Sequence, residues 1–446
     1  MTPINALEFA QLQQSEGSHP VPRKPGRSSI AAAWSSMTRL HRAFMASVAV
    51  IAVHLVDDSF LNPEPGTSAG DHLVSGIVPV TLLGLAAAGY PRARDGVRAI
   101  IAFVLGLFAV VVAGEGWYAT ANGVQSGDDY SGLPVLPAGI VLIALGSLLL
   151  WRSRRQNGSR TRRYARRAII GVVSYALLNL VVAPFLLTYA YTHISRANVP
   201  AVELGDAAYI DVSFETSDGL TLKGWYLPSR NGAAVIAFAG RTHAQNSARF
   251  LSKEGYGVLL YDRRGEAASE GDPNAFGWDR ATDVEAGIAY LKGRPEVDPD
   301  RIGGIGYSVG AEMLLEAAAT SPDLKAVVAE GAGIRSYNEA IELDGLEGWA
   351  QFPMWASAAL GTALFSGTTP PAGLKDLVRD IAPRPVLFIH AERGQGGEEL
   401  TEEYFEAAEG PKELWKTDSS HVMGYEADPD KYSRRVIKFF DNALLS

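Results

Sequence analysis

Five long apolar runs dominate the first 196 residues of this chain and constrain its fold more than any other feature. They are Leu40–Val56, His72–Tyr90, Val97–Gly114, Leu133–Trp151 and Ala168–Tyr191. A helix that crosses a bilayer needs about 20 predominantly apolar residues, with some tolerance for shorter runs. The runs therefore predict a membrane domain of about five helical spans, and the two shortest leave counts of four or six open.

The polar segments between these runs alternate in charge. Lys and Arg occur before the first run, in segment 91–98 and in segment 152–167, whereas segments 57–71 and 115–132 contain neither. Basic segments remain on the cytoplasmic side of a membrane, and buried helices of a soluble protein have no reason to alternate in this way. We therefore expect a multi-pass protein of the cell membrane with a cytoplasmic N-terminus and with the part after Arg196 outside the cytoplasm. Because the first forty residues are polar, the first run is expected to remain as an anchor instead of being cleaved as a signal peptide.

Ionisable residues near the apolar runs raise the question of a function inside the membrane. His54, Asp57 and Asp58 lie near the outer end of the first run. Ionisable groups within spans often mark a functional site, but groups at the membrane surface are more commonly hydrated, and we favour the hydrated interpretation.

Composition narrows the classes of ligand. The net charge of −9 averages two unlike halves, and the basic residues flank apolar runs, so nucleic-acid binding has little support. The chain has no cysteine, which excludes disulfides and thiolate metal sites. No metal-ligand cluster or Walker-type phosphate loop is evident, so we expect neither a metal nor a cofactor. The oligomeric state is not indicated.

Short β-rich runs alternate with helical runs from Ala201 onward. The first two runs form an expected hairpin that turns at Asp218–Gly219. Apolar strands that alternate with amphipathic helices predict a mostly parallel sheet covered by helices on both faces, with ligands beyond the carboxyl ends of the strands. The predicted organisation is a polar tail (1–39), a transmembrane domain (40–196) and an α/β domain (197–446).

Gly306-Tyr307-Ser308-Val309-Gly310 matches the G-x-S-x-G nucleophile elbow. The match alone is weak, but an apolar strand pattern precedes it and a helical pattern follows it. Such a strand–turn–helix projects the serine hydroxyl beyond the sheet edge. The backbone N–H of Val309, at the start of the helix, is then expected to stabilise an oxyanion.

A serine nucleophile needs a base, and in this arrangement an acid and then a histidine follow the serine along the chain. Of the two downstream histidines, His390 lies inside a strand pattern, whereas His421 lies in the loop between the last strand and the last helix. We expect His421 to be the base. Glu398 is the favoured acid, and Glu392, which ends the preceding strand, is the alternative. Glu398 and Glu399 open the next helix, where carboxylates often serve only the helix dipole.

The second oxyanion donor is expected from the loop after the strand 233–238. The backbone N–H of Arg241 is the candidate.

These residues resemble the α/β-hydrolase superfamily, in particular bacterial membrane-attached members related to the dienelactone-hydrolase and cocaine-esterase-like branches. The matching stretches are "GYGVLLYDRRGEAASEGDPNAFGWD", "DVEAGIAYLKGRPEVDPDRIGGIGYSVGAEMLLEAAA", "LKAVVAEGAG", "IAPRPVLFIHAERGQGGEEL" and "HVMGYEADPDKYSRRVIKFFDNAL". The resemblance covers most of 202–445 and implies an α/β-hydrolase fold, a serine-hydrolase mechanism and the roles of Ser308 and His421. Two positions depart from the usual pattern: Gly394 replaces the usual acid, and Ala239 replaces the histidine before Gly240.

A long insertion, Ile334–Pro383, separates two of the strand patterns and carries several aromatic residues. Insertions at this place often form lids over the nucleophile. The aromatic residues could equally pack in the core or dock on the bilayer.

The sequence therefore predicts a membrane-anchored serine hydrolase that cleaves an ester or related acyl bond, esterase-like, lipase-like or peptidase-like, in a small-molecule or lipid substrate. Two alternatives remain: an acyltransferase with the same residues, and a non-catalytic binding or sensing module.

Overall fold

The computed structural model describes residues 38–122, 127–152 and 159–446, apart from 195, 198, 201, 203, 205–207, 239, 337, 340–344 and 395–396. The chain forms two compact units, Met1–Ala43 and Phe44–Ser446. The candidate active site and the cavities near it belong to the second unit. The predicted boundaries at 39/40 and 196/197 stay a prediction.

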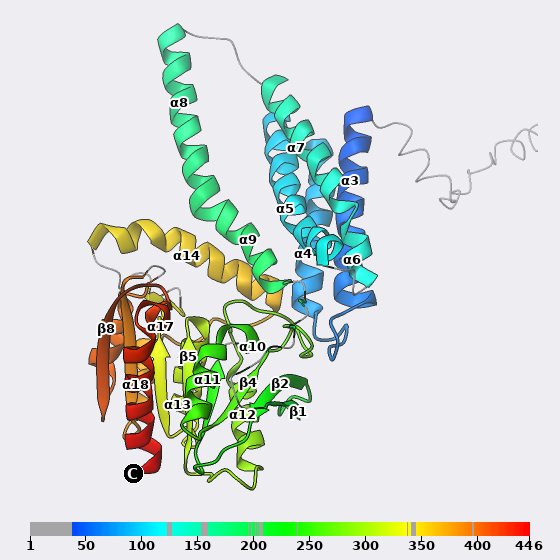
Figure 1. Cartoon of the computed structure of the whole chain (residues 1–446). Coiled ribbons are helices and arrows are strands. Elements are labelled where there is room, and N and C mark those ends of the chain that lie inside the picture. The colour runs from blue at the N-terminus through cyan, green and yellow to red at the C-terminus, as the bar shows by residue number, and fades with distance from the viewer. Residues whose placement is uncertain are drawn as a thin grey trace, which may run out of the picture. The chain divides into compact units, whose positions relative to one another are not determined.

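The first half is helical, as its apolar runs predict. Its elements are α3 (Arg39–Val56), η1 (Asp57–Leu61), α4 (Leu73–Gly89), η2 (Tyr90–Arg92), α5 (Asp95–Asn122), α6 (Gly127–Gly132), α7 (Val135–Arg152), α8 (Arg160–Leu177), η3 (Leu178–Val182) and α9 (Ala183–Thr192) (Figure 1). Within the described residues, five helical segments are long and apolar enough to cross a membrane: Arg39–Leu61, Leu73–Arg92, Asp95–Tyr118, Tyr130–Arg152 and Tyr164–Thr192. The expected number of apolar helices is confirmed.

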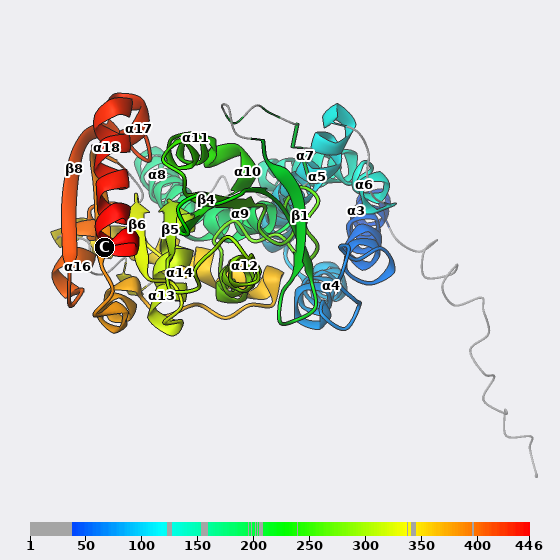
Figure 2. The ribbon, with the colours of Figure 1, turned by 60° about the horizontal axis from the view of Figure 1, so that its bottom comes forward.

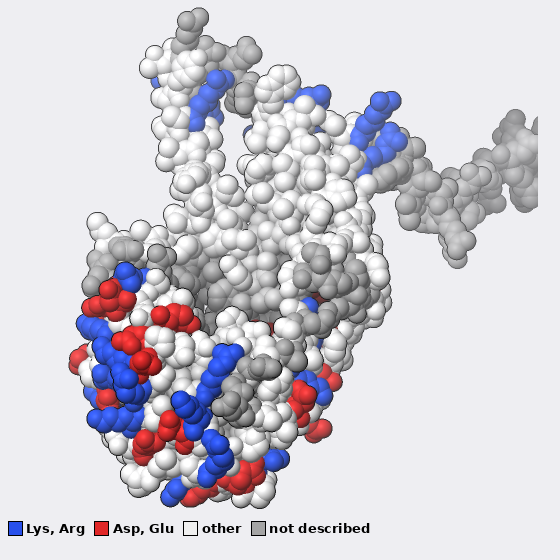
Figure 3. Space-filling model, in the orientation of Figure 1, with Lys and Arg blue, Asp and Glu red and all other residues white. Residues whose placement is uncertain are grey.

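Small residues bring α5 and α7 into close contact. A Cβ atom added at Gly106 would lie 2.7 Å from the Ile143 side chain, and one added at Gly139 would lie 2.9 Å from Ala109 Cβ. Close packing through small residues is common among membrane helices. In contrast, α8 exposes apolar side chains such as Val172, which is 69% exposed. Figure 3 shows that the visible surface of these helices is mostly uncharged.

The second half forms one eight-stranded sheet in the order β1-β2-β4-β3-β5-β6-β7-β8. Its strands are β1 (Ile210–Glu215), β2 (Thr221–Leu227), β3 (Ala234–Phe238), β4 (Gly257–Tyr261), β5 (Ile302–Tyr307), β6 (Ala326–Glu330), β7 (Val386–Arg393) and β8 (Lys412–Ser420). Pairing is antiparallel from β1 to β4 and parallel from β4 onward. The hairpin and the mostly parallel sheet are as predicted.

Helices cover both faces of the sheet, as Figure 2 shows. On one face α12 (Ala281–Lys292), α13 (Val309–Thr320) and α16 (Leu400–Ala407) share a core with β3 and β5. On the other face α11 (Gln245–Lys253) and α18 (Pro429–Phe440) complete a second core. Short helices α10 (Gly240–His243), α15 (Leu374–Leu377), η5 (Val378–Ile381), α17 (Gly424–Ala427) and η6 (Asp441–Leu445) complete the domain. The predicted α/β-hydrolase fold with about five apolar helices before it is confirmed.

The insertion 334–383 contains α14 (Gly345–Ser366), which packs beside α9. Ser357 Oγ donates a hydrogen bond to the carbonyl of Leu180 at 3.2 Å. A Cβ atom at Gly361 would lie 2.1 Å from Thr188 Oγ1, so the two helices touch at this glycine. Within the insertion, α14 therefore packs against an apolar helix of the first half, whereas Leu374, Val378 and Ile381 of α15 and η5 belong to the core of the α/β domain.

Candidate active site

Ser308 lies on a sharp turn between β5 and α13, at the carboxyl edge of the sheet. Its φ is +51°, a left-handed value that side chains rarely adopt. The turn closes over Gly306, where an added Cβ would lie 2.6 Å from the N atom of Ala311. Val309 is the first residue of α13, and the first N–H groups of a helix have no partner inside it. The elbow that the motif predicts is present.

His421 connects Ser308 to a buried carboxylate. Its Nε2 atom lies 2.9 Å from Ser308 Oγ, and its Nδ1 atom lies 2.8 Å from Glu398 Oε2. A carboxylate only accepts hydrogen bonds, so Nδ1–H donates to Glu398 and Nε2 is left to accept the proton of Ser308. Oε1 of Glu398 accepts the backbone N–H of Ala391 at 2.8 Å. Both carboxylate oxygens are therefore held in place.

Gly394 provides the space that the Glu398 carboxylate occupies. A Cβ atom at position 394 would lie 1.9 Å from Glu398 Oε2 and 2.5 Å from its Cδ atom. The φ of Gly394 is not positive, so the backbone does not itself require glycine here. In the α/β-hydrolase pattern that the sequence resembles, this position usually carries the acid. In this chain the carboxylate comes from four residues further along and fills the vacated space.

The other sequence candidates lie apart from this chain of hydrogen bonds. Glu392 and Glu399 are exposed. His390 lies on β7, as predicted, and its Nδ1 atom lies 3.1 Å from the carbonyl oxygen of Glu398. It supports the loop that carries Glu398.

Sequence reasoning missed Glu330, which accepts hydrogen bonds from two residues that follow His421 in the chain. One of its carboxylate oxygens accepts the N–H of Gly424 at 2.9 Å, and the other accepts the hydroxyl of Tyr432 at 2.5 Å. The next residue, Gly331, has a φ of +69°, and a Cβ atom there would lie 3.0 Å from His421 Cε1. The signal in the sequence is an acidic residue and a glycine directly after the buried strand β6.

The surroundings of His421 make its imidazole a stronger base. Its hydrogen bond to Glu398 raises the pKa of the imidazole above its ordinary value, against the opposing effect of burial. Burial raises the pKa of Glu330 to about 7.

The structure corrects the prediction for Arg241. Its backbone N–H donates to Asp262 Oδ1 at 3.1 Å, and its side-chain Nε–H donates to Asp262 Oδ2 at 2.7 Å. The N–H that was expected to bind an oxyanion is already engaged by a carboxylate 21 residues later in the chain. The residue before Gly240, Ala239, lies outside the described residues.

A pocket of about 550 Å³ opens beside Ser308. Its wall includes Val309, Met423 and Tyr425 from the α/β domain, and Ile194, Ala197 and Val199 from the segment that follows α9. The described residues of the insertion 334–383 do not line it. Of the alternatives for this insertion, a lid over Ser308 does not fit its described part, which lines no part of this pocket and whose helix α14 packs on α9.

At the end of the first apolar run His54 is buried and Asp58 is largely shielded from solvent, so the expectation of simple hydration is wrong for these two residues. His54 is 1% exposed, and its Nδ1 atom lies 3.0 Å from Ser131 Oγ. The Asp58 side chain is 11% exposed and lies 3.6 Å from His193 Nε2. Asp57 accepts a hydrogen bond from the exposed side chain of Asn62 at 2.8 Å.

Comparison with known proteins identifies the family of the α/β domain. Residues 196–424, just over half of the chain, match the sequence profile of X-Pro dipeptidyl-peptidase (S15 family). The chain belongs to the S15 family. It is a serine hydrolase, and the expected α/β-hydrolase membership is confirmed.

Several proteins are similar to this S15-family chain. The uncharacterized protein YfhR of Escherichia coli (strain K12) is 26% identical over 251 residues, which are 52% of this chain and 81% of that protein. The polyketide transferase ATR5 of Stachybotrys chlorohalonatus is 37% identical over 127 residues, which are 27% of this chain and 43% of that protein. The Pyrococcus furiosus esterase Pf2001 is 27% identical, with a TM-score of 0.47 over 57% of this chain and 99% of that structure.

Proposed function

We propose that the chain is a membrane-attached serine hydrolase in which Ser308, His421 and Glu398 cleave an ester or related acyl bond. One observation carries this proposal: the continuous hydrogen-bond chain from Glu398 through His421 to Ser308, which lines a pocket of about 550 Å³. A serine hydroxyl becomes a useful nucleophile when a positioned base takes its proton.

The first half of the reaction follows from these contacts. Ser308 Oγ attacks the acyl carbon while its proton passes to His421 Nε2. The negative charge that develops on the carbonyl oxygen lies near the N–H of Val309, at the start of α13. Glu398 stabilises the imidazolium without taking its proton. His421 then gives that proton to the leaving alcohol or amine, and the acyl group remains on Ser308.

Water completes the second half. It gives a proton to His421 Nε2 and attacks the acyl carbon, and the proton returns to Ser308 Oγ as the acid leaves. An acceptor other than water would make the same residues an acyltransferase. The 37% identity with a polyketide transferase over 127 residues favours testing this second reaction, by adding small alcohols and measuring ester exchange.

The experiment that tests the proposed function is hydrolysis of 4-nitrophenyl butyrate by the full chain purified in detergent. We expect turnover that is lost in Ser308→Ala and retained in Ser213→Ala, since Ser213 is an exposed serine on β1. Equal turnover by wild type and Ser308→Ala would contradict the proposal.

We also propose that the apolar helices cross the cell membrane, with the N-terminus in the cytoplasm and the α/β domain outside. The alternation of basic and non-basic segments supports this orientation. Because the chain has no cysteine, a single cysteine can report the side. A membrane-impermeant maleimide added to intact cells should label Ser213→Cys and should not label Ala93→Cys before lysis. The reverse pattern would contradict this orientation.

A further inference from the structure

A second cavity lies between α5 and α9 and adjoins the pocket beside Ser308. It measures about 290 Å³. We call this cavity the lateral groove. The residues that line it are Val111, Val112, Gly114, Glu115, Tyr118, Tyr189, Ala190, His193, Ile194 and Ala197. Ile194 and Ala197 line both the lateral groove and the pocket beside Ser308. The segment that follows α9 therefore provides a wall that the two spaces share.

Arg196 anchors that segment to both halves of the second unit. Its Nε–H donates to Glu64 Oε2 at 2.7 Å, in the loop before α4. Its Nη2–H donates to the carbonyl of Gly271 at 2.9 Å, in the loop after β4, and its Nη1–H donates to the carbonyl of Ser269. One ion pair to the first half and two hydrogen bonds to the α/β domain therefore fix Arg196 between the two halves.

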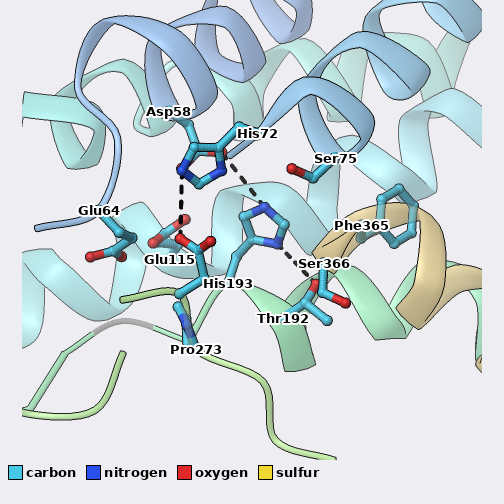
Figure 4. Close-up of a pocket in the computed structure, with 11 residues that line it drawn as sticks. Asp58, Glu64, His72, Ser75, Glu115, Thr192, His193, Pro273, Phe365 and Ser366 are labelled. Carbon is cyan, nitrogen blue, oxygen red and sulfur yellow. Dashed lines mark hydrogen bonds and ion pairs between the residues drawn. The ribbon is translucent and has the colours of Figure 1, made fainter. Parts of the chain in front are cut away.

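His193 anchors the same segment from its other end. Figure 4 shows its imidazole in a polar cavity of about 20 Å³, between Asp58 and Thr192. Thr192 Oγ1 lies 3.0 Å from His193 Nδ1, and the ring stacks on Tyr189 with centroids 3.8 Å apart. His193 and Glu115 line both this small cavity and the lateral groove. The groove therefore has a polar end, and the remainder of its wall is mostly apolar.

Exposed aromatic residues place the groove at the level of a membrane surface. Trp117 and Tyr118 on α5 are 59% and 41% exposed, and Tyr191 on α9 is 48% exposed. Trp and Tyr are enriched where spanning helices meet the membrane–water boundary. Val111 and Val112 lie about one to two turns further into the apolar part of α5, so the groove extends from this boundary toward the hydrocarbon.

We propose that the substrate is an ester with a long acyl chain that resides in the bilayer, and that its chain lies in the lateral groove while its acyl carbon reaches Ser308. This inference rests on the proposed hydrolase function and adds the substrate class. The two spaces share a wall at Ile194 and Ala197, and we place the passage of the acyl chain from the groove to the pocket at this wall. The valine, alanine and isoleucine side chains of the lining match a hydrocarbon. A short water-soluble ester needs only the pocket beside Ser308.

Two glycines provide a matched test. A Cβ atom added at Gly114 in the lateral groove meets no atom within 4 Å, and the same holds for Gly171 on α8. Gly171 is not among the residues that line the described cavities. The Cβ atom of Gly114→Phe therefore meets no neighbour, and we expect its ring to occupy part of the groove that Gly114 lines. Gly171→Phe places the same side chain on α8, away from the groove.

The full chain in phosphatidylcholine vesicles is assayed with 4-nitrophenyl butyrate and 4-nitrophenyl palmitate. We expect Gly114→Phe to lower kcat/KM for the palmitate ester at least tenfold while the butyrate value changes less than twofold. Gly171→Phe should change neither. Retained butyrate hydrolysis shows that the variant is folded. Palmitate ester supplied only in enzyme-free vesicles should react more slowly than ester in the vesicles that hold the enzyme.

Three results would overturn the inference while leaving the hydrolase intact: an unchanged palmitate-to-butyrate ratio in Gly114→Phe, a wild type that cleaves only the butyrate ester, or equal rates from the two vesicle populations. If wild type cleaves neither ester, the proposed function fails as well.

Discussion

Replacing Gly394 with alanine should disable the site although alanine is the smallest possible addition. The new Cβ would lie 1.9 Å from Glu398 Oε2, and real Cβ contacts are essentially never below 3.0 Å. The carboxylate must therefore move by about an ångström. It cannot move freely, because its two oxygens bond to His421 Nδ1 and to the N–H of Ala391, each at 2.8 Å.

The size of the effect follows from what that movement removes. A misplacement of about 1 Å in a catalytic group costs about 10²-fold in rate. Complete loss of the carboxylate that orients a catalytic histidine costs about 10⁴-fold. We therefore expect kcat/KM of Gly394→Ala to fall between about 10²-fold and 10⁴-fold, or about 3 to 5.5 kcal/mol of transition-state stabilisation.

The assay is kcat/KM for 4-nitrophenyl butyrate, with Gly293→Ala as the matched control. A Cβ atom at Gly293 would come no closer than 3.4 Å to another atom, so this variant should keep wild-type activity. The double variant Gly394→Asp with Glu398→Ala moves the carboxylate to the position that Gly394 leaves empty, and it should recover much of the lost rate. Wild-type kcat/KM in Gly394→Ala would show that the carboxylate does not depend on this space.

Two further predictions concern the base and the loop that carries it. His421 must be neutral to accept a proton, and Glu398 raises its pKa. The rate of labelling by a fluorophosphonate should therefore fall at low pH with a midpoint above the ordinary histidine pKa of about 6.5, and this midpoint should move to lower pH in Glu398→Gln. An unchanged midpoint would exclude this role for Glu398. Glu330→Ala leaves the buried Gly424 N–H and Tyr432 hydroxyl without their acceptor, at about 1–3 kcal/mol each, so it should lower both Tm and kcat. Glu330→Gln should restore part of both, because its amide oxygen can accept the Gly424 N–H while its amide nitrogen can only donate to the Tyr432 hydroxyl oxygen. Equal kcat in all three proteins would contradict a positioning role.

Local patterns in the sequence predicted the features that depend on a few consecutive residues. The nucleophile elbow needs a strand, small residues and a helix start, and all three are present around Ser308. The chain order of serine, acid and histidine restricted the base to two histidines, and the structure brings His421 to Ser308. The catalytic roles themselves remain a prediction.

Features that depend on distant residues could not be predicted in this way. The N–H of Arg241 is engaged by Asp262, which belongs to the next strand's end, and no local pattern indicates this hydrogen bond. Position alone left Glu398 and Glu392 as alternatives, since the deciding fact is the space above Gly394. In the same way, Asp58 lies 3.6 Å from Nε2 of His193, which is 135 residues away in the chain, and no local pattern indicates this contact.

The place of helix α14 in the insertion could not be predicted from the sequence either. Its aromatic residues were consistent with a lid, with a core or with the bilayer. The choice depends on Gly361, which lets α14 approach Thr188 of α9, a contact between elements far apart in the sequence.

Covalent labelling of the detergent-solubilised full chain by a fluorophosphonate, with the modified residue identified by tandem mass spectrometry, tests most directly whether Ser308 is an activated nucleophile. We predict one adduct on Ser308 that is absent in Ser308→Ala and strongly reduced in His421→Ala. A folded wild-type protein without an adduct, or with the adduct on another residue, would contradict this role for Ser308.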